Sequence, residues 1–334
     1  MNDILVPSFP YVVGWSITNK CNLACKHCNM SSGKEWENEL TYIECCNVIN
    51  ELAENNVKEI LFTGGEPFTR DDFIKICDYA ISKGIEVGVT TNSLLLDKKI
   101  IEQELWKFSD IRVSIDSIIP NEHDDFRNKK GVFAHAIDSI KLMKKNGYFV
   151  SVSTCLSKRN FMMLEDMAKY FSKIGINHWC LPLLSPDGRG KNLSSDVLSG
   201  EDIIQVIKGI KGISEKYPKI KIGVDLPYIA AMKNSGNNIN KVANCVAGIT
   251  ELTIFANGDI SPCFAMITSA GNIRSNTLKD IWNNSDMFIK FRDKTLIKGK
   301  CKECEYLYSC GGGCRANAYI KTGDFLDEDW LCWI

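Results

Sequence analysis

The sequence predicts an α/β protein in which a partial (β/α)6 barrel, similar to a TIM barrel, is followed by a small cysteine-rich α+β domain. In the first half of the chain, a short β-branched run is followed by a helical stretch six times. Such repetition is typical of parallel strands joined by right-handed crossovers. The strands are almost continuously apolar, as expected where both faces of a sheet are buried. Six units are fewer than the eight of a closed barrel, so we expect an open, curved sheet.

The six predicted strands are short and end at polar or glycine-rich turns. We expect them at residues 11–18, 58–63, 86–91, 111–115, 149–156 and 179–184. The intervening helices are expected at residues 41–55, 71–82, 97–107, 132–145 and 161–174. Thr41 and Glu44 have the spacing of a capping box, which fixes the start of the first helix.

The composition changes after the sixth unit and divides the chain into three expected regions. The barrel takes residues 1–190, a bridging region takes residues 191–244, and the cysteine-rich domain takes residues 245–334. In the bridge we expect a helix at 201–216, a short strand at 220–224 and a polar linker at 232–240. In the last region, Asn257 and Gly258 separate two short apolar runs, a strong signal for a hairpin, and a helix is expected at 277–284.

The overall composition is that of an ordinary soluble globular protein. Of the 334 residues, 45% are hydrophobic and 24% are charged, and the formal net charge of −1 gives no field that would attract nucleic acid. We see neither a membrane span nor a secretory signal, and residues 1–10 leave no room for an N-terminal peptide-binding domain. Fifteen cysteines without a signal suit a reducing cytoplasm, where clustered thiols are typical of metal sites.

Three cysteines directly follow the first predicted strand. Cys21, Cys25 and Cys28 are separated by three and then two residues, so one loop can direct three thiolates at the corners of an iron–sulfur cube. The fourth iron would keep an open position, which favours chemistry at that iron. Zinc motifs usually have a second Cys or Cys/His pair, and this triplet has none nearby. Three unliganded thiols in one loop would be prone to oxidation.

Two further polar groups follow other predicted strands. Gly64, Gly65, Glu66 and Pro67 end the second strand, where glycines permit close backbone approach and a carboxylate can hold an ammonium group. Alone, this turn is also compatible with a plain loop. Ser114 and Asp116 end the fourth strand two residues apart, so both face one side of the sheet and could bind a ribose. A turn cap by Asp116 is the alternative.

Together, these motifs resemble the radical S-adenosylmethionine superfamily over about residues 11–190. The resemblance implies a [4Fe–4S] cluster on Cys21, Cys25 and Cys28 whose open iron is chelated by the methionine part of S-adenosylmethionine. It implies that Glu66 lies at the cofactor's amino group and that Ser114 and Asp116 lie at its ribose. One electron then cleaves the sulfonium to a 5′-deoxyadenosyl radical, which abstracts hydrogen from substrate. An external electron donor of the flavodoxin or ferredoxin type belongs to this chemistry.

The C-terminal region contains seven more cysteines, which exceeds what a core needs. Zinc ribbons are the alternative, because CxxC pairs bind zinc readily. The order and gaps resemble the SPASM extension of peptide-modifying and protein-modifying radical enzymes over about residues 245–334. The resemblance implies one auxiliary [4Fe–4S] cluster on Cys301, Cys304, Cys310 and Cys332, and another on Cys245, Cys263 and Cys314. The chain would then hold three clusters, and we expect the last one to keep an open or non-cysteine position facing the barrel mouth.

The five remaining cysteines lie on predicted helices or strands, where a thiol acts as a small buried hydrophobe. They are Cys45, Cys46, Cys77, Cys155 and Cys180, of which the last two could face the barrel lumen.

The favoured function is radical modification of a ribosomally made peptide, which leaves a crosslinked, epimerised or oxidised residue. A separate leader-binding protein is an expected partner. The alternatives are chemistry on a small molecule or tetrapyrrole, or anaerobic sulfatase maturation, whose enzymes have an extra cysteine between the first two SPASM positions that this chain lacks. The segment after the sixth strand, Gly188-Arg189-Gly190, resembles the corresponding segment of peptide-modifying relatives and also that of relatives that act on a small molecule or tetrapyrrole. A non-catalytic electron carrier is a third class, but a carrier would not need an open iron.

Overall fold

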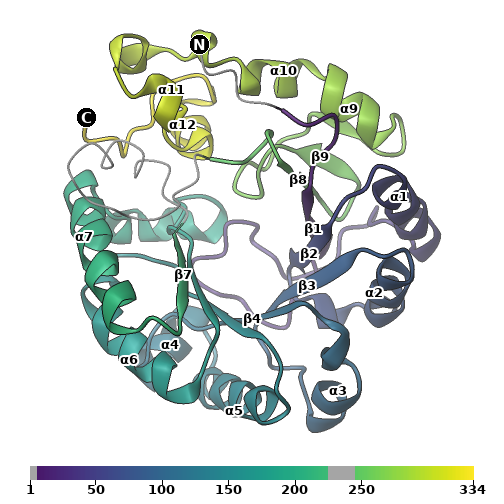
Figure 1. The fold of residues 1–334 in the computed structure, drawn as a ribbon, viewed down its shortest axis with the longest axis vertical. Coiled ribbons are helices and arrows are strands. Elements are labelled where there is room, and N and C mark those ends of the chain that lie inside the picture. Colours follow the sequence, from purple (N-terminus) through teal and green to yellow (C-terminus); the bar gives the residue numbers. More distant parts are fainter. Residues whose placement is uncertain (1–5, 225–244) are drawn as a thin grey trace.

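The fold is a curved parallel sheet covered by helices on its outer side (Figure 1). The computed structural model describes residues 6–224 and 245–334, so the polar linker expected at 232–240 lies outside the described residues. Within the described residues, ten strands form one sheet in the order β10-β9-β8-β1-β2-β3-β4-β5-β6-β7. The predicted fold class, a partial barrel followed by a cysteine-rich region, is confirmed.

Seven of the strands belong to the barrel, and all pair in parallel with their neighbours. They are β1 (Val12–Thr18), β2 (Glu59–Gly64), β3 (Glu86–Thr91), β4 (Asp110–Ser114), β5 (Val150–Ser153), β6 (His178–Leu181) and β7 (Lys221–Val224). The first six correspond to the six predicted strands. The short strand expected in the bridge, β7, pairs with β6 and so extends the barrel sheet beyond residue 190.

The helices that follow the barrel strands agree with the pattern read from the sequence, with three differences. They are α1 (Tyr42–Glu54), α2 (Phe73–Ser82), α3 (Lys98–Gln103), α4 (Pro120–Arg127), α5 (Val132–Lys145), α6 (Leu164–Ile174) and α7 (Gly200–Lys216). The Thr41/Glu44 capping box is present at the start of α1. The helix expected at 97–107 is shorter because α3 ends at Gln103 and a 3-10 turn follows. Likewise, a 3-10 turn precedes α6.

Helix α4 was not expected from the sequence. It begins at Pro120, a residue favoured in the first turn, and its sequence is strongly polar, so no apolar periodicity marks it. Its buried face consists of His123, Phe126 and Arg127, two of which are polar. The helix is therefore held by polar contacts to the site described below.

The C-terminal region joins the barrel sheet directly. Strand β8 (Glu251–Ile254) pairs in parallel with β1 and antiparallel with β9 (Asp259–Ser261), so the hairpin predicted at Asn257-Gly258 is confirmed. Strand β10 (Gly271–Asn272) then pairs antiparallel with β9 at the edge of the sheet. The helices that follow are α9 (Leu278–Asn284), α10 (Asp286–Arg292), α11 (Leu307–Cys310) and α12 (Arg315–Thr322). No helix in the described part of the chain combines the length and apolar character needed to cross a membrane.

The sheet and helices enclose one large apolar core. Its largest fully buried side chains include Trp15 on β1, Phe62 on β2 and Trp179 on β6. Cys45 and Cys77, on α1 and α2, are buried in this core, as expected for thiols that act as small hydrophobes. The core side chains occupy alternate positions of the strands, such as Val13, Trp15 and Ile17 on β1, so the intervening positions, such as Val12 and Gly14, face the barrel interior.

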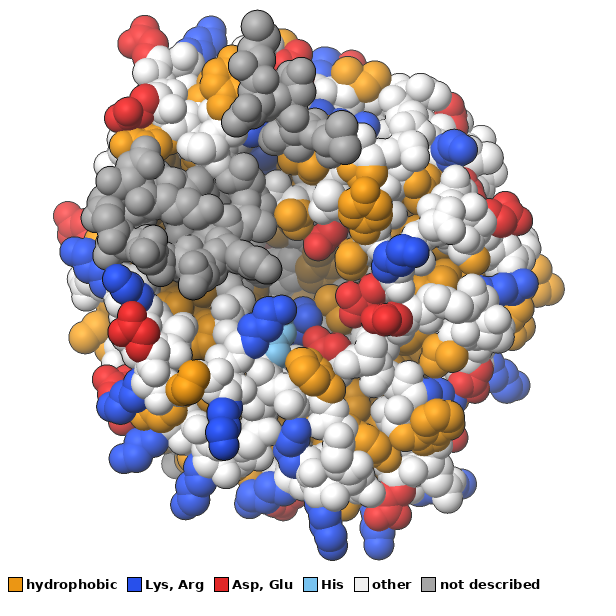
Figure 2. All heavy atoms as spheres, in the orientation of Figure 1, with side chains coloured by type: hydrophobic (Ala, Val, Ile, Leu, Met, Phe, Trp, Pro, Cys, Tyr) orange, Lys and Arg blue, Asp and Glu red, His pale blue; other side chains and the backbone are white. Residues whose placement is uncertain are grey.

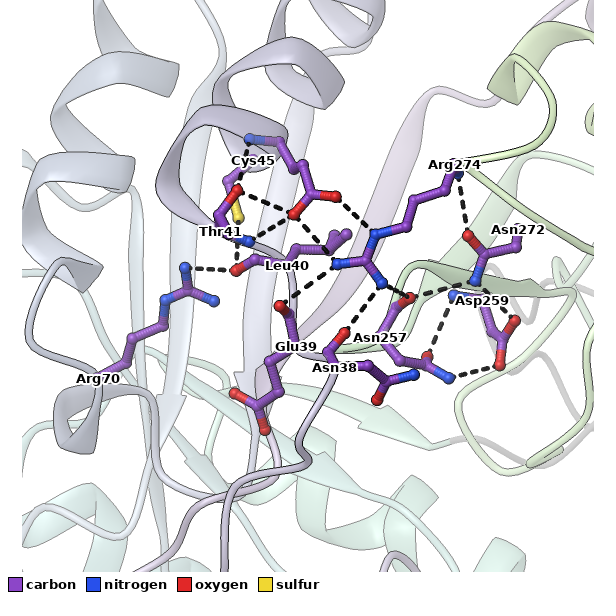
Figure 3. Close-up of polar contacts among 11 residues, drawn as sticks. Asn38, Glu39, Leu40, Thr41, Cys45, Arg70, Asn257, Asp259, Asn272 and Arg274 are labelled. Atoms are coloured by element: carbon purple, nitrogen blue, oxygen red, sulfur yellow. Dashed lines mark hydrogen bonds and ion pairs between the residues drawn. The ribbon is translucent and has the colours of Figure 1, made fainter.

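A polar clamp fixes the C-terminal hairpin against the start of α1 (Figure 3). Arg274 pairs with Glu44 at 2.6 Å and also donates to the backbone oxygens of Asn38 and Asn257. Arg70 acts from the other side by donating to the carbonyl oxygens of Ile17 and Leu40. The segment before α1 is therefore held between the barrel and the C-terminal region.

We predict that Arg274→Met lowers the free energy of unfolding by about 1–2 kcal/mol. Charge-assisted hydrogen bonds contribute more than this when shielded, but here both partners are about one third exposed, so solvent screens them. Denaturant unfolding should be compared with that of Lys279→Met, which changes an exposed cation on neighbouring α9. Equal stability of the two variants would contradict the clamp.

Candidate functional site

Cys21, Cys25 and Cys28 lie in the loop beyond the carboxyl end of β1 and line a large cavity inside the barrel. The pKa of Cys21 is raised to about 11, mainly by burial. The negative charges of Glu66, Cys25 and Cys28 also act to raise this pKa, whereas a hydrogen bond from the Leu23 amide acts to lower it. The Ser32 amide donates to the Cys28 sulfur at 3.4 Å. Thiols gathered in this way repel each other as thiolates, a conflict that a bound metal cluster removes.

The glycine-rich turn after β2 packs directly against the start of this loop. Gly64 has a φ of +130°, and a Cβ on Gly65 would lie 2.1 Å from the carbonyl oxygen of Lys20. Both glycines line the cavity, and Pro67 begins a short 3-10 turn. The close approach explains why this turn needs glycine, as the sequence indicated.

Glu66 is completely buried behind the turn. Its carboxylate accepts hydrogen bonds from the Thr91 hydroxyl at 2.8 Å and from the Asn92 amide at 2.7 Å. Burial raises the pKa of Glu66 to about 7, although these hydrogen bonds oppose the shift. The side chain is therefore fixed in orientation, and a cationic group nearby would favour its charged form.

Ser114 and Asp116 have different surroundings, and only Ser114 belongs to β4, because Asp116 lies two residues beyond the end of the strand. Ser114 ends β4 and lines the cavity. Asp116 lines a smaller neighbouring pocket, where it pairs with Arg127 at 2.7 Å and accepts from the Cys155 amide at 2.9 Å. Burial alone would raise the pKa of Asp116, but Arg127, His27 and His123 together lower it to about 2.

Arg127 is a site residue that the sequence analysis missed. It is buried at the end of α4, and its Nη1 lies 3.9 Å from the Cys25 sulfur while its Nε binds Asp116. It thus links the cysteine loop with the end of β4. No local sequence pattern marks an arginine as buried. Only the position of Arg127 in space, between Cys25 and Asp116, identifies it as a site residue.

Cys245, Cys263 and Cys314 come together on a second part of the same cavity wall. The pKa of Cys314 is raised well above its usual value by burial first, then by Asp329, Cys245 and Cys263. The Asp329 carboxylate accepts from the Cys314 amide. Cys245 precedes β8 and Cys263 follows antiparallel β9, so both lie toward the amino end of β8. This group was expected at the barrel mouth, but it lies at the strand end opposite to Cys21.

The remaining four C-terminal cysteines form a third group. The pKa of Cys301 is raised to about 11, mainly by burial. The positive charge of Arg315 acts to lower this pKa, whereas the neighbouring thiols of Cys332, Cys310 and Cys304 act to raise it. The Gly313 amide donates to the Cys310 sulfur at 3.2 Å. Among the described residues around the cavity, none belongs to this group, so it lies behind the wall and not on it.

The cavity that joins the first two groups has a volume of about 1160 Å³. Cys155 and Cys180 also line it, as expected for thiols facing the lumen. Figure 2 shows the molecule hollowed near the centre of one face, with hydrophobic and charged side chains around the hollow. The space is sufficient for a cofactor together with part of a second molecule.

Buried polar atoms at this wall indicate that it is shaped for a ligand. Within the described residues, His27 Nδ1, Ser32 Oγ and Ser185 Oγ are buried without a hydrogen-bond partner, and all three residues line the cavity beside Cys28. Unsatisfied buried polar groups are costly and rare. The thiol groups at Cys21, Cys25 and Cys28 and at Cys245, Cys263 and Cys314, together with the unpaired polar atoms on the same cavity wall, have the donor chemistry that iron–sulfur clusters and a polar cofactor need.

Two family models match the chain in the regions that form this site. The Radical SAM superfamily model matches residues 15–171, and the model of the SPASM iron–sulfur cluster-binding domain matches residues 245–305. The first range contains Cys21, Cys25 and Cys28, and the second begins at Cys245.

Similar proteins cover nearly the whole chain. An AdoMet-dependent heme synthase of Methanosarcina barkeri is 32% identical and covers 98% of each chain. The mycofactocin maturase MftC of Mycobacterium tuberculosis is 29% identical and covers 95% of this chain and 81% of its own. The fold matches Streptococcus suis SuiB bound to its precursor peptide SuiA with a TM-score of 0.83 and 18% identity, over 98% of this chain and 77% of SuiB.

We predict that Gly65→Ala destabilises the protein by about 1–3 kcal/mol, the usual cost of overpacking, because the new methyl group meets the Lys20 carbonyl. Gly33→Ala is the matched control in the same region, since a Cβ there has no atom within 4 Å. Thermal unfolding measures both. A Gly65→Ala variant as stable as Gly33→Ala would show that the turn does not pack as described.

Proposed function

Because the chain belongs to the radical S-adenosylmethionine superfamily and carries a SPASM domain, we propose that it is a maturase of ribosomally made peptides. Hydrogen abstraction would leave a crosslinked, epimerised or oxidised residue in the peptide. The chain is a radical SAM enzyme that uses S-adenosylmethionine and iron–sulfur clusters. The observation that carries the peptide proposal is the large cavity lined both by Cys21, Cys25 and Cys28 and by Cys245, Cys263 and Cys314, together with likeness to a peptide maturase.

Three [4Fe–4S] clusters are our proposal for the metal content. Cys21, Cys25 and Cys28 would hold the first, the Cys245 group the second, and the Cys301 group the third. When bound, the first cluster and S-adenosylmethionine supply a 5′-deoxyadenosyl radical after one-electron cleavage of the sulfonium.

The chain's own residues would bind and orient the cofactor. Gly64, Gly65 and Pro67 shape a turn close to the cysteine loop, and the buried Glu66 carboxylate would face the cofactor's amino group. Ser114, on the cavity wall, would bind the ribose. Asp116 would act at the ribose site through Arg127 and Cys155, two cavity-lining residues that bind its two carboxylate oxygens.

The second cysteine group would serve the substrate. Seven C-terminal cysteines leave one ligand position open where two full clusters need eight. The three cysteines of this group line the cavity, so a substrate thiolate could reach the metal they hold, where it would be deprotonated and oriented. A protein ligand at that position would instead leave only electron transfer.

A tetrapyrrole is the second candidate substrate, favoured by one specific observation. The heme synthase relative is 32% identical over 98% of both chains, a closer match than the maturase relative at 29%. The cavity is large enough for a porphyrin, and Arg112, Arg189 and Lys211 on its wall could meet carboxylates. Anaerobic sulfatase maturation is less well supported because the chain lacks an eighth C-terminal cysteine.

The partners follow from the same chemistry. We propose an external electron donor of the flavodoxin or ferredoxin type, and a leader-binding protein that presents the peptide. The net charge of −1 gives no reason to expect nucleic acid. Fifteen free thiols suit a reducing compartment, so we place the enzyme in the cytoplasm.

We predict about twelve irons per chain, with matching sulfide, in anaerobically reconstituted protein. Changing Cys21, Cys25 and Cys28 together to Ala should leave about eight irons and abolish release of 5′-deoxyadenosine, because only the first cluster is lost. Iron and sulfide analysis with chromatography measures both. Zinc without sulfide in the C-terminal region would refute the cluster assignment.

We predict that the reduced, S-adenosylmethionine-loaded enzyme modifies a peptide encoded beside its gene and consumes one cofactor for each event. In deuterated water, a crosslink or an oxidation changes the peptide mass by itself, and epimerisation changes it by the uptake of one solvent deuterium. The parallel reaction contains an iron porphyrin in place of the peptide. Mass spectrometry reads both products. Turnover of the porphyrin and not of the peptide would overturn the maturase proposal in favour of tetrapyrrole chemistry.

A further inference from the structure

The segment Gly188-Arg189-Gly190, after β6, lies directly on the cysteine loop. Gly188 has a φ of +54°, and a Cβ there would lie 2.1 Å from the Asn29 carbonyl oxygen. A Cβ on Gly190 would lie 2.3 Å from the Ser185 carbonyl oxygen and 3.5 Å from that of His27. A side chain at Gly188 would push the segment away from the cysteine loop, whereas a side chain at Gly190 would meet Ser185 in its own segment, so the contact with the loop depends on Gly188.

Arg189 fastens this segment to the loop through three hydrogen bonds. Its Nε donates to the Cys25 carbonyl oxygen at 2.7 Å, and its Nη1 donates to that of Ser32 at 2.9 Å. Its backbone amide donates to the Cys28 carbonyl oxygen at 2.9 Å. Arg189, which follows β6, therefore binds Cys25, Cys28 and Ser32. Ser32 is the residue whose amide donates to the Cys28 sulfur.

The loop is closed elsewhere by its own backbone. The Cys21 amide donates to the Gly33 carbonyl oxygen at 2.9 Å, and the Gly33 amide donates to the Asn19 carbonyl oxygen at 3.0 Å. These two hydrogen bonds join the two ends of the loop. The tip, with Cys25 and Cys28, is held by Arg189 and by Arg127 at the Cys25 sulfur. A planar guanidinium that binds two carbonyl oxygens fixes their separation, which a flexible lysine cannot do.

We propose that Arg189 is a positioning residue whose guanidinium fixes Cys25 relative to Ser32, the residue whose amide donates to the Cys28 sulfur, and so governs how firmly this cluster is retained. The inference rests on the proposed cluster at Cys21, Cys25 and Cys28 but concerns the loop and not the substrate. This proposal assigns a role to the Gly188-Arg189-Gly190 segment. Gly188 permits the contact with the cysteine loop, and Arg189 fixes that loop by hydrogen bonds.

The test measures loss of iron to a chelator from reconstituted enzyme without substrate. The part of the electron paramagnetic resonance signal that changes on adding S-adenosylmethionine reports this cluster alone. We expect the Arg189→Met variant to lose the iron of this cluster at least about tenfold faster than wild type, because charge-assisted hydrogen bonds are broken. The rate of iron loss from Arg189→Lys should lie between those of wild type and Arg189→Met. The other two clusters and the melting temperature should stay close to wild type. Lys191→Met is the control, an exposed cation two residues away that pairs with Asp187.

Gly188→Ala separates the segment from the loop by a different route and should reproduce the effect of Arg189→Met. Wild-type retention in both variants would overturn the inference alone. Equal loss from all three clusters with a lower melting temperature would also overturn it, because that result indicates a general role in folding. A wild-type chain that binds no iron would overturn the proposed function and this inference together.

Discussion

The parallel pairing of β1 with both β2 and β8 is the constraint on which the rest of the structure depends. Val12 lies in register with Glu59 on one side and Glu251 on the other, so the barrel and the C-terminal region share one sheet. The first cysteine group follows the carboxyl end of β1, and Cys245 precedes the amino end of β8. The inner face of the sheet therefore becomes the wall that connects two cysteine groups at opposite strand ends.

The electrostatics of the site result from burial more than from net charge. Asp116 and Arg127 form a buried pair, and loss of either partner would leave a charge with little solvation. The same pair contacts the Cys155 amide and the Cys25 sulfur, so its geometry is transmitted to the cavity wall. Burial also lowers the pKa of His27 to about 3, which keeps its ring neutral where it stacks on Phe126 at 4.1 Å.

The features predictable from the sequence were those with a local pattern. Apolar runs located the strands, a capping box located α1, and Asn257-Gly258 located the hairpin. Helix α4 was missed because its buried face is polar, and Arg127 was missed because its pairing with Asp116 and its approach to Cys25 depend on that helix. Arg189 was noted only as part of the Gly188-Arg189-Gly190 segment, because its carbonyl partners lie 164 and 157 residues away. The position of the Cys245 group was misjudged because its placement depends on the direction of β9, which spacing between cysteines does not reveal.

The pairing of β1 with β8 also has a consequence for biosynthesis. Synthesis proceeds at about 5–20 residues per second, and β8 is made long after β1. One edge of β1 thus remains without its native partner while the other barrel strands assemble, and β1 is a largely apolar strand that is mostly buried in the finished protein. Such an edge can recruit foreign strands. The nascent chain is consequently most vulnerable to aggregation until its last quarter has left the ribosome, and chaperone occupancy should be greatest in that interval.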